Sequence, residues 1–101
     1  LDRAHVAQIA ERLIADLARR LDAQGIAMDI EPEVVQRLLD RGGFDSSLGA
    51  RPLRRAIARL LEAPLADMLL RGELRPGSVV MVVAEGEGLG FDVVDAKQQT
   101  A

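Results

Sequence analysis

The stretch GARPLRRAIARLL, residues 49–61, carries the strongest pattern in the chain. Its apolar side chains recur at intervals of three and four residues, which predicts a helix with one buried face. These residues are Leu53, Ile57, Leu60 and Leu61. Pro52 would stand in the first turn, where its missing N–H costs no hydrogen bond. Pro64 should kink or break this helix, and a further turn or two should end at Gly72.

Upstream of this stretch, the sequence predicts a long helix, a short strand and a second helix. Residues 3–24 form the long helix, because five apolar residues at three- or four-residue spacing would share one face. They are Val6, Ile9, Leu13, Leu17 and Leu21. Gly25 would end this helix in a left-handed conformation. Residues 26–30 alternate as in a strand. The second helix then runs from Pro32 to about Asp40, stops at the glycine pair 42–43, and is followed by a loop over residues 44–50.

Downstream, the sequence predicts two more strands. Residues 79–84 are rich in β-branched side chains, GEGLG at 86–90 forms the hairpin connection, and residues 91–94 form the last strand. GEGLG lacks the spacing, the following helix and the Lys-Ser/Thr pair of a phosphate-binding loop. The fold class is therefore α+β, with three main helices packed on a small three-stranded sheet. We expect one domain over residues 1–96 and a polar tail over residues 97–101.

The composition excludes several classes of function. The 101 residues carry 13 basic and 16 acidic side chains, a net charge of −3 with the single histidine neutral. Without cysteine there is no thiolate nucleophile, disulfide or zinc cluster, and one histidine cannot build a multi-histidine metal site. No apolar run approaches the roughly 18–20 residues that span a bilayer, so we expect no membrane partner. The two phenylalanines are the only aromatic residues, which together with the acidic balance argues against nucleic-acid binding.

Four arginines fall within nine positions, at the start of the helix predicted from residue 51. They are Arg51, Arg54, Arg55 and Arg59. Positive side chains at a helix N-terminus oppose the helix dipole, so their placement there favours a bound anion such as a phosphate. The other interpretation is a solvated basic face, paired with acids from other helices. A protein–protein or nucleic-acid binding module that uses the Arg51–Arg59 face is the alternative function.

At this point the sequence resembles a known family. Phe44-Asp45, then Leu48-Gly49-Ala50-Arg51-Pro52-Leu53 and the residues up to Ile57, are similar to the sensor-2 signature of Clp-type AAA+ unfoldases. The similarity is to the C-terminal small subdomain of the second ATPase module in the ClpB and ClpC group. It extends from about residue 2 to residue 94, and its downstream part includes the LRGELRPG stretch at residues 70–77.

The resemblance implies a lid beside a larger ATPase subdomain, with ATP or ADP and magnesium held between them in the full-length protein. Arg51 matches the sensor-2 arginine, which contacts the γ-phosphate. Gly49 and Ala50 would bring the backbone close to the nucleotide, and Ile9 and Leu13 would border the adenine pocket. Arg54 and Arg55 would serve a partner interface. The implied partners are the large ATPase subdomains of the same chain and of the neighbouring subunit in a homo-hexamer, together with client polypeptides, in the cytoplasm.

The chain departs from the family pattern in two ways. The family has Tyr-Asp-Pro where this chain has Phe44-Asp45-Ser46, so the loop before Arg51 lacks a hydroxyl and a proline. The 101 residues also contain no phosphate loop and no acidic metal-binding strand. We therefore expect this chain to be part of an ATPase only within the full-length protein, to bind no nucleotide firmly by itself, and to carry no catalytic residue of its own.

Overall fold

The computed structural model describes residues 2–95. The expected polar tail, residues 97–101, lies outside the described residues. The helical elements are α1 (Arg3–Asp22), α2 (Glu33–Leu38), the π-helical segment η1 (Leu39–Gly43), α3 (Arg51–Ile57), the π-helical segment η2 (Ala58–Glu62) and α4 (Ala63–Leu70). The strands are β1 (Ala27–Ile30), β2 (Ser78–Glu85) and β3 (Gly88–Asp95).

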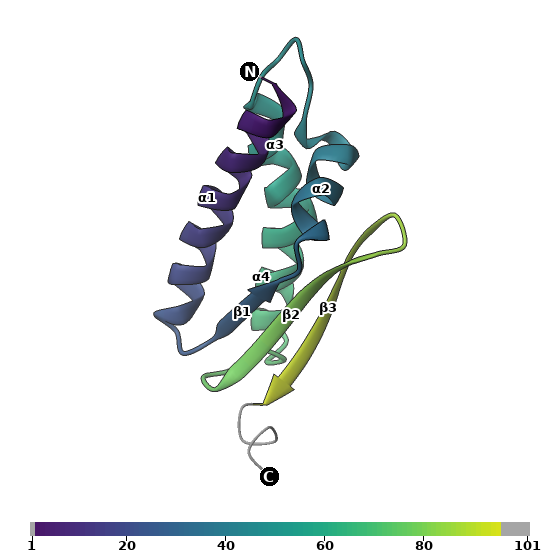
Figure 1. Ribbon diagram of the computed structural model, residues 1–101. Coiled ribbons are helices and arrows are strands. Elements are labelled where there is room, and N and C mark those ends of the chain that lie inside the picture. Colours follow the sequence, from purple (N-terminus) through teal and green to yellow (C-terminus); the bar gives the residue numbers. More distant parts are fainter. Residues whose placement is uncertain (1, 96–101) are drawn as a thin grey trace.

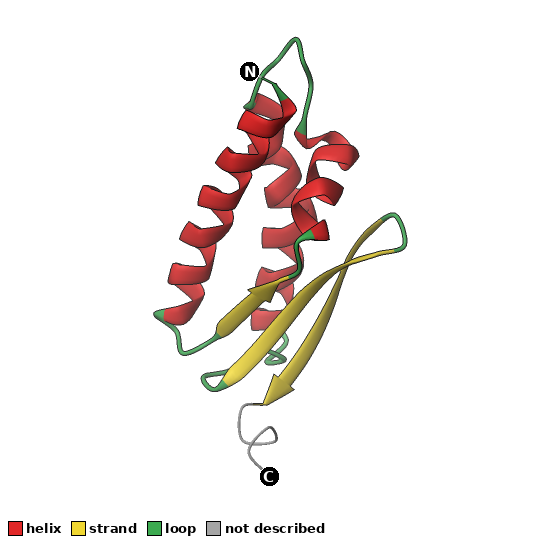
Figure 2. Ribbon diagram, viewed as in Figure 1, coloured by secondary structure: helices red, strands yellow, loops and turns green. Residues whose placement is uncertain are grey.

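Helices cover one side of a three-stranded sheet (Figures 1 and 2). The strand order is β1-β2-β3, with β1 parallel to β2 and β2 antiparallel to β3. This arrangement confirms the expected α+β class and the helices-on-sheet architecture. The hairpin is also confirmed, although the turn is shorter than expected and β3 begins at Gly88 rather than at Phe91.

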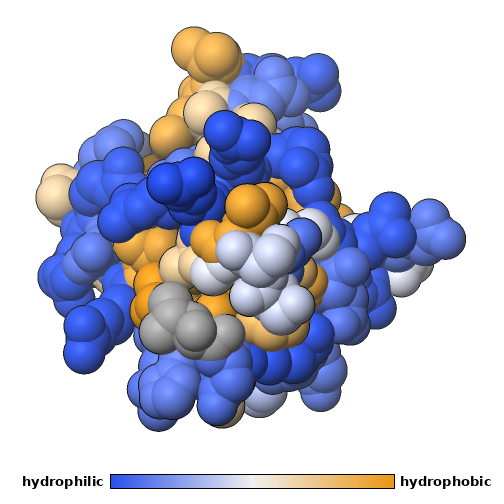
Figure 3. All heavy atoms as spheres, turned by 90° about the horizontal axis from the view of Figure 1, so that it is seen from above, coloured by the Kyte–Doolittle hydropathy of each residue, from blue (hydrophilic) through white to orange (hydrophobic). Residues whose placement is uncertain are grey.

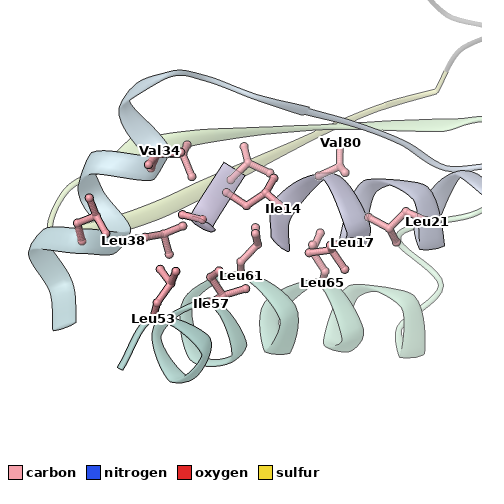
Figure 4. Close-up of a cluster of buried hydrophobic side chains, with 14 of the residues drawn as sticks. Ile14, Leu17, Leu21, Val34, Leu38, Leu53, Ile57, Leu61, Leu65 and Val80 are labelled. Atoms are coloured by element: carbon pink, nitrogen blue, oxygen red, sulfur yellow. The ribbon is translucent and has the colours of Figure 1, made fainter. Parts of the chain in front are cut away.

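The core is aliphatic and lies between α1, α2 with η1, the helical segment from α3 to α4, and the inner face of the sheet (Figure 4). The helix α1 buries one stripe along its length. The stripe consists of Val6, Ala10, Ile14, Leu17 and Leu21. Ile9 and Leu13, expected on this face, lie at its edge: both are half-buried and pack against the core, because the four-residue spacing from Val6 turns the buried stripe toward Ala10 and Ile14.

The expected break at Pro64 does not occur, since helical structure continues from Arg51 to Leu70. Instead, η2 widens the helix just before the proline, and the Ala63 N–H donates to the Ala58 carbonyl. A π-turn holds more residues than an α-turn, so it can absorb the hydrogen bond that Pro64 cannot make. Leu60, expected in the buried stripe, is half-buried.

The widened turn also explains how four leucine and isoleucine side chains stay on one face. Leu53, Ile57, Leu61 and Leu65 are all buried although each is four residues from the next. In an α-helix of 3.6 residues per turn, each four-residue step advances by about 40°, so such a row drifts around the helix. The wider turn of η2 offsets this drift and keeps Leu61 and Leu65 directed into the core.

A tight turn at the end of η1 joins the α2–η1 helical segment to the 44–50 loop. Gly42 has φ +107°, which confirms that the glycine pair ends the helix. Gly43 is buried, and a Cβ at this position would lie 2.5 Å from the Leu38 carbonyl oxygen. Only glycine therefore fits at residue 43.

The turn of the β2–β3 hairpin is fastened to α2. The Arg37 guanidinium donates two hydrogen bonds through Nη1, to the carbonyl oxygens of Gly86 at 2.6 Å and Gly88 at 2.9 Å. Arg41 lies 3.7 Å from the Glu87 carboxylate in the same turn. These contacts hold the far end of the hairpin against the helical layer.

Candidate functional site

The loop before Arg51 is organised by a single carboxylate. One oxygen of Asp45 accepts hydrogen bonds from the Ser47 N–H at 2.8 Å, the Ser47 hydroxyl at 2.6 Å and the Leu48 N–H at 3.3 Å. The Asp45 carbonyl accepts a further bond from the Gly49 N–H at 2.9 Å. Asp45 thus folds residues 45–49 into a turn that leads into the start of α3, although residue 46 is a serine and not a proline.

We expect this turn to loosen in acid. The hydrogen bonds from Ser47 hold the pKa of Asp45 below its usual value of 3.8, because they favour the charged carboxylate. A lowered pKa in the folded protein means that the stabilisation is present above pH 3.8 and is lost as the pH falls through the lowered value. The Ser47 amide resonance should therefore titrate below pH 3.8 in an NMR pH series. In the variant Asp45→Asn, whose side chain cannot ionise, the chemical shift of the Ser47 amide should not change over this pH range. If the same titration persisted in that variant, the Asp45 carboxylate would not be its cause.

The start of α3 combines a left-handed glycine with an uncapped helix end. Gly49 has φ +67°, and Ala50 offers no side-chain cap to the helix that begins at Arg51. The first turn of α3 contains no acidic residue. Arg51 is exposed and forms no hydrogen bond or ion pair with any residue in the range 2–95. This end of the molecule therefore presents a guanidinium beside a helix start, with no ion-pair partner among residues 2–95.

Figure 3 looks down onto the end of the molecule where the 44–50 loop and the starts of α1 and α3 lie. The surface there is largely hydrophilic, with apolar atoms gathered near its centre. Leu48, in the loop three residues before Arg51, is 53% exposed. Leu48 belongs to the motif around Arg51, but nothing in the sequence pattern indicates that its side chain is exposed.

The structure brings two of the predicted site residues together. Leu13 of α1 and Arg54 of α3 line one cavity of about 260 Å³. Its other lining residues are Asp16, Arg20, Ile57 and Glu62. Arg20 and Glu62 close one side of it with an ion pair at 3.1 Å. The sequence analysis did not single out this pair of residues, which are far apart in the chain and whose spacing gives no sign that they meet.

The remaining predicted residues lie outside that cavity. Ile9 is half-buried on α1, and Arg55 is exposed on α3. The guanidinium of Arg59 is engaged locally, donating to the Arg41 carbonyl at 2.8 Å. The basic face expected from Arg51 to Arg59 is therefore divided: Arg59 fastens η2 to η1, while Arg51 and Arg55 point to solvent.

Among residues 2–95, no three His, Asp or Glu side chains gather in a way that could hold a metal ion. In the same range, no helix combines the length and the apolar character needed to cross a membrane.

Comparison with known proteins agrees with the geometry. The family described as the C-terminal, D2-small domain of ClpB protein matches residues 1–82. The chain is 43% identical over 88 residues to the chaperone protein ClpC3, chloroplastic, of Oryza sativa, which covers 87% of this chain and 9% of that protein. It is 36% identical over 91 residues to the chaperone protein ClpB of Pseudomonas putida, covering 90% of this chain and 10% of the relative.

The chaperone protein ClpD, chloroplastic, of Arabidopsis thaliana is 35% identical over 88 residues, which cover 87% of this chain and 9% of that protein. The chain thus spans about a tenth of the length of the relatives it matches. Two of these three relatives are named as chloroplastic and the third is bacterial, so the cytoplasmic location stays a prediction. The match over residues 1–82, together with the helices-on-sheet fold, shows that the chain belongs to the family of C-terminal D2-small domains of ClpB protein.

Proposed function

We propose that this chain is the lid subdomain of an ATP-dependent Clp chaperone and that Arg51 senses the bound nucleotide. One observation carries the proposal: Arg51 is exposed at an uncapped helix start and has no partner in residues 2–95. A guanidinium placed in this way is available to a phosphate, which it can contact with two parallel hydrogen bonds. Gly49, at φ +67°, lets the backbone turn sharply immediately before it.

The charge on Arg51 would distinguish ATP from ADP, because only ATP presents a γ-phosphate. A ligand shifts a conformational equilibrium by the difference in its affinity for the two states. A charge-assisted hydrogen bond contributes about 1.5–3 kcal/mol. One or two such bonds, made only with ATP, are enough to favour one orientation of the lid over another.

The other predicted residues would complete the site. Gly49 and Ala50 would approach the nucleotide through their backbone, and the half-buried Ile9 and Leu13 leave apolar surface for the base. Arg54 and Arg55 would contact the large ATPase subdomain of the same chain or of the neighbouring subunit in a homo-hexamer. The phosphate loop and the magnesium ligands would come from the rest of the full-length protein.

Hydrogen exchange in the full-length protein tests this proposal. With a slowly hydrolysed ATP analogue bound, amides in residues 44–59 should exchange more slowly than with ADP, because the γ-phosphate would hold the start of α3. Residues 78–95 of the hairpin serve as the internal control and should exchange equally with either nucleotide. Equal exchange of residues 44–59 with both nucleotides would mean that this segment does not sense the γ-phosphate.

A further inference from the structure

A second hollow lies on the opposite side of α1 from the Leu13–Arg54 cavity. It has a volume of about 420 Å³ and is lined by α1 on one side and by the end of β1 and the start of α2 on the other. Its walls are mostly apolar and include Ile14, Ala15, Ala18, Ile30 and Val35. A smaller hollow of about 290 Å³ continues from Ala18 along Ile26, Ala27 and Met28, with the charged residues Arg19 and Asp22 also on its wall. Together they form a groove between α1 and β1, which we call the α1–β1 groove.

One wall of the α1–β1 groove is an unpaired strand edge. The order β1-β2-β3 leaves β1 with no neighbour on its outer side among residues 2–95. The Glu31 N–H donates to the Val82 carbonyl at 3.0 Å, so Glu31 and, by alternation, Asp29 direct their backbone groups toward β2. The N–H and C=O groups of Met28 and Ile30 therefore point away from the sheet, to the open edge.

Backbone groups at an open edge can pair with another extended chain. Strand addition supplies affinity through main-chain hydrogen bonds, and pockets for alternate side chains supply specificity. In the α1–β1 groove, the outward N–H and C=O groups of Met28 and Ile30 would supply the main-chain hydrogen bonds. The apolar wall of α1 would supply the side-chain pockets. Small side chains at Ala15 and Ala18 leave room for an added strand beside the helix. A helix has no free main-chain groups to offer this edge, so the geometry favours an extended occupant.

The charges at the groove define the occupant further. Glu11 and Glu31 line the larger hollow, which no Lys or Arg lines. In the smaller hollow, Arg19 is paired with Asp16, and Asp22 adds a further carboxylate. Neither glutamate forms an ion pair among residues 2–95. We infer that the α1–β1 groove binds an extended polypeptide segment with alternate apolar side chains and flanking basic residues, which adds as a strand to the outer edge of β1. This inference is independent of the nucleotide site.

A designed peptide tests the inference on the 101-residue chain. The probe is an acetylated and amidated peptide of alternating valine and threonine, with lysine at both ends. NMR titration should shift the amide resonances of Met28 and Ile30 and give contacts between the peptide backbone and β1. A matched peptide, N-methylated at alternate residues so that its strand-facing amides cannot donate, should lose binding. Equal binding of both peptides would overturn strand addition.

Variants of the chain locate the binding site. Ala15→Arg should weaken peptide binding by at least about tenfold, because a long side chain at this exposed position of α1 would fill the α1–β1 groove. Ala66→Arg, at an exposed alanine within α4, is the matched control and should leave binding unchanged. Glu31→Gln should weaken binding by roughly two- to fivefold, as expected for an exposed ion pair, whereas Glu73→Gln should have no effect.

Three results would overturn the inference. The peptide could fail to bind, or it could bind equally well to Ala15→Arg. Alternatively, the resonances of Met28 and Ile30 could shift with protein concentration in the absence of peptide, which would assign the edge to a second copy of this chain. Should Ala15→Arg fail to fold, the comparison of the two peptides on the unchanged protein decides the question alone.

Discussion

Replacing Arg51 by alanine in the full-length protein is expected to lower ATP turnover by about tenfold to a hundredfold. That range corresponds to the loss of one charge-assisted hydrogen bond of about 1.5–3 kcal/mol in the reacting complex. The fold should be intact, because Arg51 is exposed and contacts no partner within residues 2–95. Steady-state phosphate release measures the effect, and circular dichroism and thermal unfolding verify the fold.

Two further variants make this result specific. Arg51→Lys keeps the charge but loses the planar pair of donors, so its turnover should fall between those of the wild type and Arg51→Ala. Arg75→Ala removes an exposed arginine from the turn before β2, at the end of the molecule far from the 44–50 loop (Figure 1), and should leave turnover unchanged. Normal turnover in Arg51→Ala would remove this residue from the site.

Gly43→Ala is expected to destabilise the chain by about 3 kcal/mol or more, at the upper end of the range for overpacking. The added methyl group would lie 2.5 Å from the Leu38 carbonyl oxygen and 3.4 Å from Leu53 Cδ1. The nearer atom belongs to the backbone and cannot rotate away, so the reversal between α2 and the loop would have to open. For a domain of this size the loss corresponds to a Tm roughly 12–24 °C lower, which calorimetry measures.

The control for this prediction is Gly88→Ala at the start of β3. A Cβ at Gly88 would have no heavy atom within 4 Å, and the residue does not require a left-handed conformation. Its Tm should stay close to that of the wild type. Similar losses in both variants would show that backbone freedom, rather than the clash at Gly43, controls the stability.

Much of the fold could be predicted from the sequence because its signals are local. Periodic apolar residues predicted α1, and β-branched residues predicted β2. Gly25 and Gly42 have the positive φ angles expected of residues that end helices. Contacts between distant residues could not be predicted in this way. The pairing of Arg37 with the hairpin carbonyls joins residues 49 and 51 positions apart, and no spacing in the sequence indicates it.

The candidate site stays a prediction from a local motif. The motif at residues 49–57 points to Arg51, and the structure leaves that side chain exposed, as a phosphate contact would require. The packing of α1 was harder to predict, since a three-residue and a four-residue step both fit a helix. Only the neighbouring elements decide that Ile14 is buried and that Leu13 lies at the Leu13–Arg54 cavity. Leu13 is half-buried: it packs against the core and keeps part of its side chain at the cavity wall.

The widened helical turn at η2 makes the length of this segment as important as its composition. The wide turn already accommodates one residue more than a regular α-helix would. Deleting one residue between positions 58 and 62 would therefore let the segment close into a regular α-helix with Leu65 on the same face, whereas inserting one would rotate everything that follows by about 100°. After such an insertion Leu65 would turn out of the interior, and the loop that leads into β2 would start in a different direction. Substitutions at the exposed position Ala58 should be tolerated far better than an insertion, so this helix can lose one residue but cannot gain one.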